Sequence, residues 1–172
     1  SLSLDEAVNM ALEKNADVVR LCSYAPLFAH TEAWQWTPDL IWLDNLSVYG
    51  TPSYYVQKMF SNNRGDIVVS LNSNSQKIFA TAAIDKKENK LILKIINPYG
   101  NSEKCTFKIA GVNVPKQQVK GVILNGKSAD ECNSIETPHN VIPKEFNLAI
   151  ENGNFLFDMP QWSFVVMRII IK

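Results

Sequence analysis

The sequence lacks an excess of charge of either sign. Its 172 residues contain 17 Lys and Arg against 17 Asp and Glu, and these charges are scattered along the chain. Domains that bind nucleic acid or a membrane surface gather basic residues into a patch or a run. We therefore expect no nucleic-acid partner and no membrane partner.

Long apolar runs and an even set of cysteines are also missing. The longest apolar runs, Phe164–Met167 and Ile169–Ile171, are far too short to cross a bilayer. Cys22, Cys105 and Cys132 are odd in number and lack C-x-x-C spacing, so we expect no disulfide framework, although a Cys105–Cys132 bond stays open. The first residues lack a basic region followed by an apolar core, so we expect no signal peptide within this chain, and this says nothing about export if it belongs to a longer protein.

Motifs for metals, phosphates and nucleophilic catalysis are absent as well. His30 and His139 are far apart, and no Cys, His and Asp residues stand at the spacing of a metal site. The sequence contains no phosphate-cradling glycine loop, no dinucleotide fingerprint and no nucleophile elbow. We expect neither a metal nor a cofactor.

Aromatic residues, in contrast, are concentrated in the segment Tyr24–Phe60. It holds three of the four tryptophans and four of the five tyrosines. Large rings bury much apolar area and often form a core. Ring faces also line sugar-binding pockets, where polar neighbours fix the hydroxyl groups. Both interpretations stay open for the segment, although Trp42, inside an apolar run, is expected in the core.

Four short motifs follow one another in this region. They are Asn15–Arg20, Ser23–Phe28, Trp34–Trp42 and Tyr49–Phe60. In this order and spacing they resemble the end of an α-L-arabinofuranosidase of glycoside hydrolase family 51, over roughly residues 3–61. The resemblance continues more weakly in Asn133–Pro138 and Ser163–Arg168.

The resemblance implies a catalytic (β/α)8 barrel followed by a β-sandwich. Such enzymes release terminal α-L-arabinofuranosyl residues, as from arabinan or arabinoxylan, with retention of configuration. A complete barrel needs about 250 residues, so it cannot lie within this chain. The family's acid/base and nucleophile glutamates belong to earlier motifs that are absent here, so no catalytic residue is expected in this chain.

We therefore expect the C-terminal portion of a retaining arabinofuranosidase, inactive alone and structural in role. Its partners would be the missing barrel and, for the intact enzyme, an arabinose-containing oligosaccharide or polysaccharide. A homo-oligomer stays open. A periplasmic or extracellular location is favoured over a cytoplasmic one.

The pattern of residues 1–61 predicts a helix, a strand and a second helix, a remnant of a (β/α)8 barrel. A helix that begins near Ser3 should bury one apolar stripe, which comprises Leu4, Ala7, Val8, Ala11 and Leu12. Ala16–Cys22 is typical of a buried strand. Asp39–Leu43 should be extended, and Thr51 and Pro52 should begin a helix that buries Tyr55, Val56, Met59 and Phe60.

The polar cluster Ser61–Asp66 marks a domain boundary. After it, the pattern predicts a mainly β fold: an antiparallel, jelly-roll-like β-sandwich over residues 65–172. Asn152-Gly153 should form the turn of a hairpin. The expected strands are Ile67–Leu71, Ile78–Ile84, Lys90–Asn97, Cys105–Ile109, Val119–Leu124, Phe146–Ile150, Phe155–Met159 and Phe164–Ile171.

Candidate substrate-binding residues follow the predicted barrel strand. Ser23 and Tyr24 come directly after it, at the end where barrel enzymes bind substrate, although Tyr24 could equally pack in the barrel. Trp34 and Trp36 lie in the next loop and could form either a pocket wall or a plug against the sandwich. These four residues are expected to serve only in the intact enzyme.

Other polar residues of the aromatic segment are weaker candidates. Glu32, Asp39 and Asp44 are acids of the kind that glycosidases pair, but each is more typical of a loop or cap. His30 could bond a substrate hydroxyl, although a lone loop histidine usually does not.

Two further classes of function compete with the enzyme part. A carbohydrate-binding module would stack Trp34, Trp36 or Trp162 on arabinan or arabinoxylan, and a third possibility is a purely structural domain. Saturable binding of arabino-oligosaccharides in calorimetry would distinguish the module. Whichever holds, the apolar helix faces should dock on the sandwich or on a neighbouring chain, because a soluble monomer does not leave a large apolar patch bare.

Overall fold

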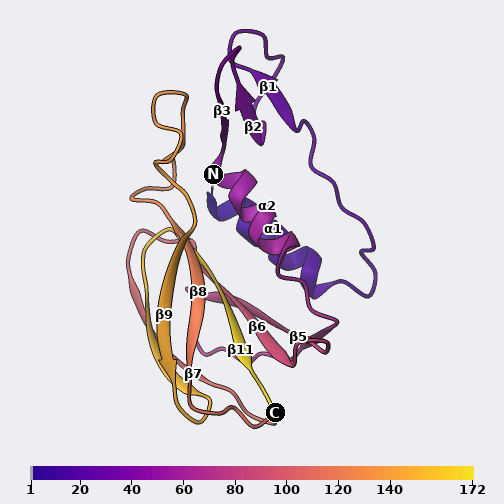
Figure 1. The fold of residues 1–172 in the computed structure, drawn as a ribbon, viewed down its shortest axis with the longest axis vertical. Coiled ribbons are helices and arrows are strands. Elements are labelled where there is room, and N and C mark those ends of the chain that lie inside the picture. Colours follow the sequence, from indigo (N-terminus) through magenta and orange to yellow (C-terminus); the bar gives the residue numbers. More distant parts are fainter. Residues whose placement is uncertain (1) are drawn as a thin grey trace.

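The computed structural model describes residues 2–172, with side chains from Asp5 onward, and this range contains two helices and eleven strands (Figure 1). The helices are α1 (Leu2–Lys14) and α2 (Pro52–Ser61). The strands are β1 (Phe28–His30), β2 (Ile41–Leu43), β3 (Val48–Gly50), β4 (Ile67–Val69), β5 (Phe79–Asp85), β6 (Lys90–Asn97), β7 (Glu103–Lys108), β8 (Gln117–Asn125), β9 (Lys144–Ile150), β10 (Asn154–Met159) and β11 (Ser163–Ile170). No described helix is long and apolar enough to span a membrane.

Most of the chain forms a β-sandwich. Six antiparallel strands make the larger sheet, in the order β4-β5-β6-β11-β8-β9, and β7 and β10 pair as the smaller one. Each of the eight segments expected to be strands overlaps one of β4–β11. The predicted fold class, mainly β with an antiparallel sandwich, is confirmed.

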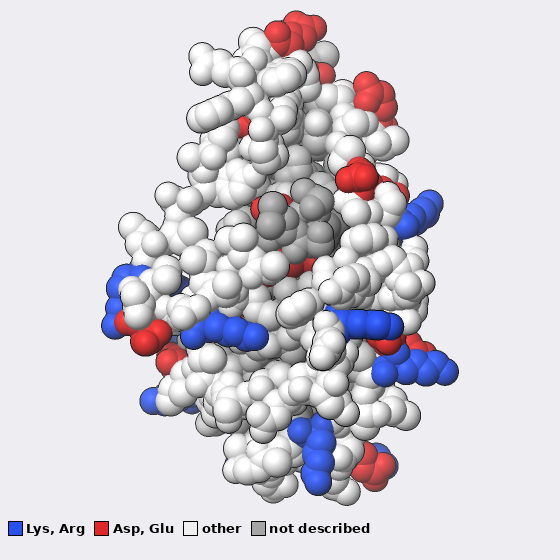
Figure 2. All heavy atoms as spheres, turned by 180° about the vertical axis from the view of Figure 1, so that it is seen from behind, with Lys and Arg blue, Asp and Glu red and all other residues white. Residues whose placement is uncertain are grey.

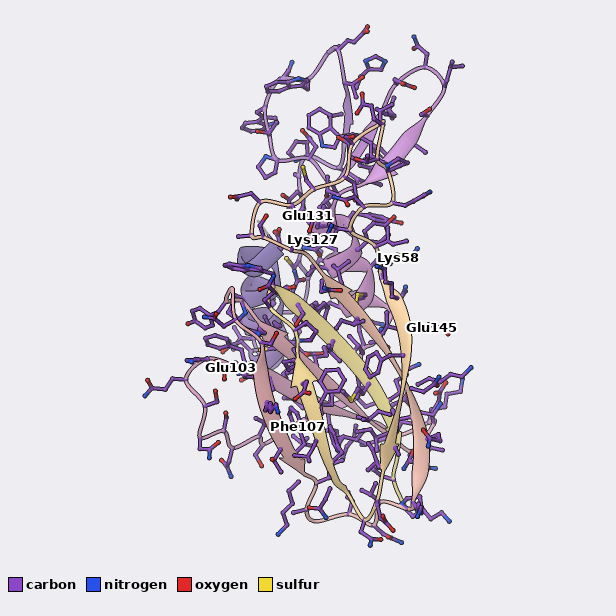
Figure 3. All side chains as sticks on the ribbon, turned by 90° about the vertical axis from the view of Figure 1, so that its left-hand side faces the viewer. Lys58, Glu103, Phe107, Lys127, Glu131 and Glu145 are labelled. Carbon is purple, nitrogen blue, oxygen red and sulfur yellow. The ribbon has the colours of Figure 1, made fainter. Side chains whose placement is uncertain are left out.

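The central strands β6 and β11 are buried on both faces. Leu93, Ile95 and Met167 point into the space between the sheets, where Phe107 stacks on Phe155 at 4.8 Å between ring centroids (Figure 3). The opposite faces of β6 and β11 lie in a second core that includes residues of both helices. This double burial explains why both strands are continuously apolar runs rather than alternating ones.

Helix α2 forms as its sequence predicts. Thr51 caps it, because its hydroxyl accepts a bond from the Tyr54 N–H at 3.2 Å, and Pro52 follows at the first position. Val56, Met59 and Phe60 are buried against the larger sheet. The Phe60 ring stacks on Phe164 of β11, with 4.7 Å between the centroids.

Helix α1 docks on the sheet by the opposite face from the one predicted. Ala7, Val8 and Ala11 of the expected apolar stripe are exposed, whereas Glu6 and Met10 are buried. The prediction of the buried face was therefore wrong. The side chains of Ser3 and Leu4 lie outside the described residues. Ala7, Val8 and Ala11 stay exposed because Glu13, on the opposite face of α1, pairs with Lys94 of the sandwich.

The predicted strand Ala16–Cys22 is also wrong, because this segment has no regular structure. It runs along the outside of the molecule between α1 and β1 (Figure 1), and Val18 and Leu21 are 76% and 90% exposed. A strand needs a neighbouring strand to satisfy its backbone groups. No described strand lies beside this segment.

The turn at Asn152-Gly153 forms, but the hairpin does not extend beyond it. Both residues have positive φ, 50° and 73°, and the Asn154 N–H donates to Glu151 at 2.9 Å. Beyond this turn β9 pairs with β8 while β10 pairs with β7. The connection therefore crosses from one layer of the sandwich to the other.

The aromatic segment forms a small sheet at the end of the molecule away from the sandwich strands (Figure 1). The expected extended segment is its central strand β2, which pairs in parallel with β1 and antiparallel with β3. Asn133, from the loop between β8 and β9, holds this sheet by donating to the Gly50 carbonyl at 2.8 Å. The division at residues 61–65 stays a prediction, because the helices and the larger sheet share a core.

Candidate functional site

The two helices run in the same direction, and this sets the geometry of the candidate site. At their N-terminal ends the Ser53 hydroxyl donates to the Asp5 carboxylate. Towards their C-terminal ends, Lys94 bonds to Glu13 of α1 and lies 5.0 Å from the ring centroid of Phe60 in α2. The parallel helices of a β/α barrel have this relation, with all their N-termini on the side where substrate binds.

Tyr24 lies near this N-terminal end of the helices. It is half-buried, and burial raises the pKa of its hydroxyl, with further contributions from the nearby charges of Asp5 and Asp39. Tyr24, two residues after the predicted barrel strand, therefore lies near the start of α1. Ser23, its neighbour, is exposed.

The acids of the aromatic segment differ in their surroundings. Asp44 accepts the Leu46 and Ser47 N–H groups at 2.7 and 2.6 Å, which lowers its pKa, so it is a turn cap. Glu32 is exposed. Asp39 is only 3% exposed, and in the described part of the chain its Oδ2 atom has no hydrogen-bond partner. A buried, unpaired carboxylate oxygen is unusual and marks Asp39 as the most distinctive acid of the site.

The two candidate tryptophans project from the small sheet rather than packing in a core. Trp34 is 52% exposed and Trp36 is 66% exposed. Trp34 touches Trp42 edge to face, with 6.2 Å between the ring centroids. Trp42 is half-buried in β2, so its expected place in the core is wrong.

The structure thus brings Tyr24 close to acids, and Trp34 close to Trp42, as two separate groups. Sequence reasoning missed Asp5 and Ser53, which join the two helix starts. The parallel direction of β/α helices is the signal that could have found them, because it places successive helix N-termini at one end.

Charge on this end of the molecule is acidic only. The sequence has no Lys or Arg between Arg20 and Lys58, and the upper end of the face in Figure 2 carries acidic side chains without basic ones. His30 accepts the Glu32 N–H through Nδ1 at 3.2 Å. Within residues 2–172 no group of three or more His, Cys, Asp and Glu could hold a metal ion. The three cysteines are free.

Trp162 lies in a tight turn just before β11, beside the residues that follow β6 and β8. Its N–H donates to Tyr99 and its carbonyl accepts from Gly126, both at 3.0 Å. The indole lies against Gly100. A half-buried ring held in this way closes the end of the sandwich.

The molecule is thus a β-sandwich whose larger sheet carries two parallel helices on its outer face, with an aromatic segment at one end (Figure 1). The family model for the α-L-arabinofuranosidase C-terminal domain matches residues 4–163. The chain belongs to this family, and the resemblance to family 51 is confirmed.

Individual relatives support this assignment to the family. The chain is 34% identical to α-L-arabinofuranosidase 1 of Arabidopsis thaliana over 94% of its length, and 36% identical to the probable α-L-arabinofuranosidase A of Aspergillus oryzae over 96%. Among solved structures, the arabinose-bound MgGH51 α-L-arabinofuranosidase superposes with a TM-score of 0.91 over the whole chain, at 28% identity. The arabinofuranosidase of Thermotoga maritima, 16% identical, shares the fold with a TM-score of 0.81 over 99% of this chain and 38% of its own.

The chain spans only part of these proteins. It covers 25% and 26% of the two curated relatives and 27% of the MgGH51 chain. The similarity therefore concerns a C-terminal domain and does not extend to the remaining three quarters of such an enzyme.

Proposed function

We propose that this chain is the non-catalytic C-terminal part of a retaining α-L-arabinofuranosidase, here called the parent enzyme. The parent would remove terminal α-L-arabinofuranosyl residues from arabinan or arabinoxylan. A periplasmic or extracellular location belongs to the same proposal.

The inverted orientation of α1 is the observation that carries the proposal. A helix on a soluble domain normally buries its apolar stripe and exposes its polar one. Helix α1 departs from this rule, because Glu6 and Asn9 are buried together with Met10 while Val8 is 49% exposed. The exposed apolar segment Ala16–Cys22 follows directly. Together they form a surface suited to the rest of a barrel, the natural partner of this domain.

In the parent enzyme, hydrolysis with retention needs one carboxyl group as acid and a second as nucleophile, about 5–5.5 Å apart. Both would come from the barrel strands outside this chain. Tyr24 and Asp39 would contribute polar groups at the rim of the sugar pocket. Trp34 and Trp36 would offer ring faces to the part of the polysaccharide that extends out of the pocket.

The first experiment is an assay of the 172-residue chain with 4-nitrophenyl α-L-arabinofuranoside. We expect no turnover above that of a heat-unfolded sample. Turnover that survives repurification would overturn the proposal. In the parent enzyme, Tyr24→Phe should lower kcat/KM, whereas Tyr99→Phe, on the sandwich, should not.

A carbohydrate-binding module is the second candidate, because Trp34 and Trp36 are exposed on one loop. Calorimetry of the chain with arabino-oligosaccharides separates the two functions. Saturable heat that disappears in Trp36→Ala and persists in Trp162→Ala would favour the module. No heat would favour a domain that contributes to substrate binding only as part of the parent.

A further inference from the structure

The two layers of the sandwich differ greatly in width. The larger sheet has six strands, whereas the smaller has β7 and β10 only. β7 pairs with β10 along one edge. Among the described strands none pairs with the other edge, so β7 presents a row of free backbone groups.

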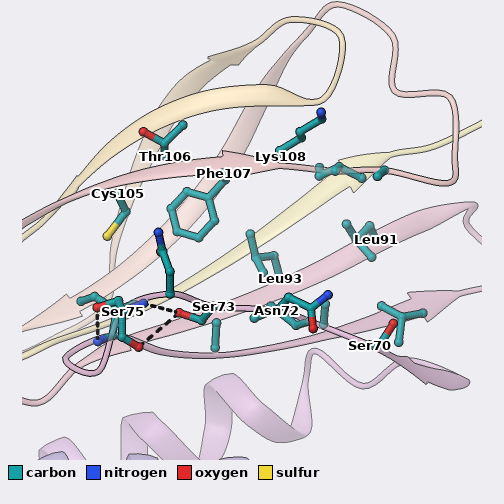
Figure 4. A pocket seen from close by; sticks show the side chains of 18 of the residues that line it. Ser70, Asn72, Ser73, Ser75, Leu91, Leu93, Cys105, Thr106, Phe107 and Lys108 are labelled. Atoms are coloured by element: carbon teal, nitrogen blue, oxygen red, sulfur yellow. Dashed lines mark hydrogen bonds between the residues drawn. The ribbon is translucent and has the colours of Figure 1, made fainter.

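That open edge borders a groove of about 520 Å³ (Figure 4). One wall is the continuous run Glu103–Ala110 and the other is the segment Val69–Ser75. Because successive side chains of a strand point to opposite faces, a wall made of consecutive residues is the edge of the strand itself. The floor is apolar and comes from β5 and β6, including Ala82, Leu91 and Leu93.

The direction of the backbone groups in β7 follows from one hydrogen bond. The Ile109 N–H, just past β7, donates to Gly153 on the β10 side at 2.9 Å. In an antiparallel pair, this orientation alternates from residue to residue. The N–H groups of Lys104, Thr106 and Lys108 therefore point away from β10, into the groove.

We propose that an extended segment of the longer polypeptide, outside this sequence, occupies the groove and pairs with β7 as a third strand of the smaller sheet. Its inward side chains would be apolar, to cover the floor of alanine and leucine. Its outward side chains would be neutral or acidic, because those of Lys104 and Lys108 flank it. This proposal rests on the proposed function, in which the chain is part of a parent enzyme. The chain covers only 25–27% of its relatives, so the rest of such a parent would be long enough to supply the strand.

A second copy of this chain fits the groove poorly. Two β7 strands paired antiparallel about Thr106 would place Lys104 opposite Lys108. Like charges directly opposite on paired strands are destabilising. Lysines on an open edge are a common means of preventing such self-pairing.

Amide hydrogen exchange of the chain alone and of the full-length parent tests the proposal. The Lys104, Thr106 and Lys108 amides should exchange freely in the chain alone. In the parent they should slow by roughly tenfold or more, the effect of one ordinary backbone hydrogen bond. The Cys105 and Phe107 amides, which face β10, should be protected in both and serve as the internal control.

Two outcomes would overturn the proposal. Equal, fast exchange of the three amides in both proteins would show that no strand is added. Protection in the chain alone that grows with its concentration would show that a second copy fills the groove.

A proline substitution gives an independent readout. In the chain alone, the Thr106 N–H has no partner among the described strands. The thermal unfolding midpoint of the Thr106→Pro variant should therefore equal that of the Thr106→Ala variant. In the parent, Thr106→Pro should lower the midpoint well below that of Thr106→Ala, because proline cannot donate to an added strand. Equal midpoints for both variants in the parent would contradict the proposal, whether or not the parent hydrolyses arabinofuranosides.

Discussion

At the scale of single residues, Lys94 is the most unusual side chain of the molecule. It is fully buried in β6 and pairs with Glu13 of α1, and the Phe60 ring lies beneath its ammonium group. Burial lowers its pKa, and the bond to Glu13 acts in the opposite direction. A buried charge is tolerated only when it is paired, so this lysine determines which face of α1 can dock.

Replacing Lys94 with methionine should therefore destabilise the chain. Lys94→Met leaves the Glu13 carboxylate largely buried without a partner, and such a loss costs about 3 kcal/mol in the free energy of unfolding. Urea unfolding measures it. The matched control Lys104→Met, on an exposed lysine, should change stability by no more than about 0.5 kcal/mol. The double variant Lys94→Met/Glu13→Gln should regain most of the loss; if it does not, the pair is not the cause.

Glu6 supplies a prediction about pH. It is 1% exposed, and burial, with a smaller contribution from Asp5, raises its pKa well above 4.5. The folded state then holds a proton that the unfolded state has lost, so this group's contribution to stability falls as pH rises from about 4.5 to its folded pKa.

Glu6→Gln removes that titration. The variant should match the natural chain near pH 4 and become the more stable of the two as pH rises, with a constant difference above the pKa of Glu6. Thermal unfolding at a series of pH values provides the curve. Glu32→Gln, an exposed acid, is the control and should show no such divergence. A difference between the Glu6 proteins that is independent of pH would refute the assignment.

At the scale of elements, strands β4–β11 and both helices follow from local patterns, whereas the buried face of α1 does not. The stripe of α1 has the spacing of a buried helix face, and the spacing correctly indicates a helix. It cannot indicate which neighbour covers which face. In this chain the buried face carries Glu13, which pairs with Lys94, and Met10, which lies in the core on the larger sheet. Ala7, Val8 and Ala11 of the stripe are exposed.

Two substitutions on α1 test this orientation. Met10→Ala, at a position 3% exposed, should cost about 3 kcal/mol of unfolding free energy, as other buried methionines do. Val8→Ser, on the exposed stripe, should cost no more than about 0.5 kcal/mol in the chain alone. In the parent enzyme Val8→Ser should cost about 1 kcal/mol, because there the side chain would be buried. The reverse order in the chain alone would mean that the apolar stripe packs on the sandwich after all.

At the scale of the whole molecule, both helices pack on the sandwich, whereas the segment that follows α1 is covered by no other part of the described chain. Val18 and Leu21 are among the most exposed apolar residues of the chain. Irregular, exposed apolar backbone is a preferred site of proteolysis.

Limited digestion with thermolysin should therefore cut before Val18 and Leu21 first, with the β-strands from β5 onward intact. Mass spectrometry of the early products identifies the bonds. In the parent enzyme the same bonds should resist, because a neighbouring barrel strand would hold the segment. Equal rates of cleavage in both proteins would argue against a strand at Ala16–Cys22 in the parent.

Features that depend on neighbours along the chain could be predicted from the amino-acid sequence. Period-two and apolar runs specify strands, Thr51 and Pro52 specify a helix start, and ordered motifs between residues 15 and 60 specify the family. Three features became visible only in the folded chain: which face of α1 is buried, the irregular backbone of Ala16–Cys22, and the entry of β9 and β10 into different sheets. Each of these features depends on a partner distant in sequence, or on a surface that another part of the protein must cover. Local sequence patterns do not indicate such partners, because they reflect only residues that are close along the chain.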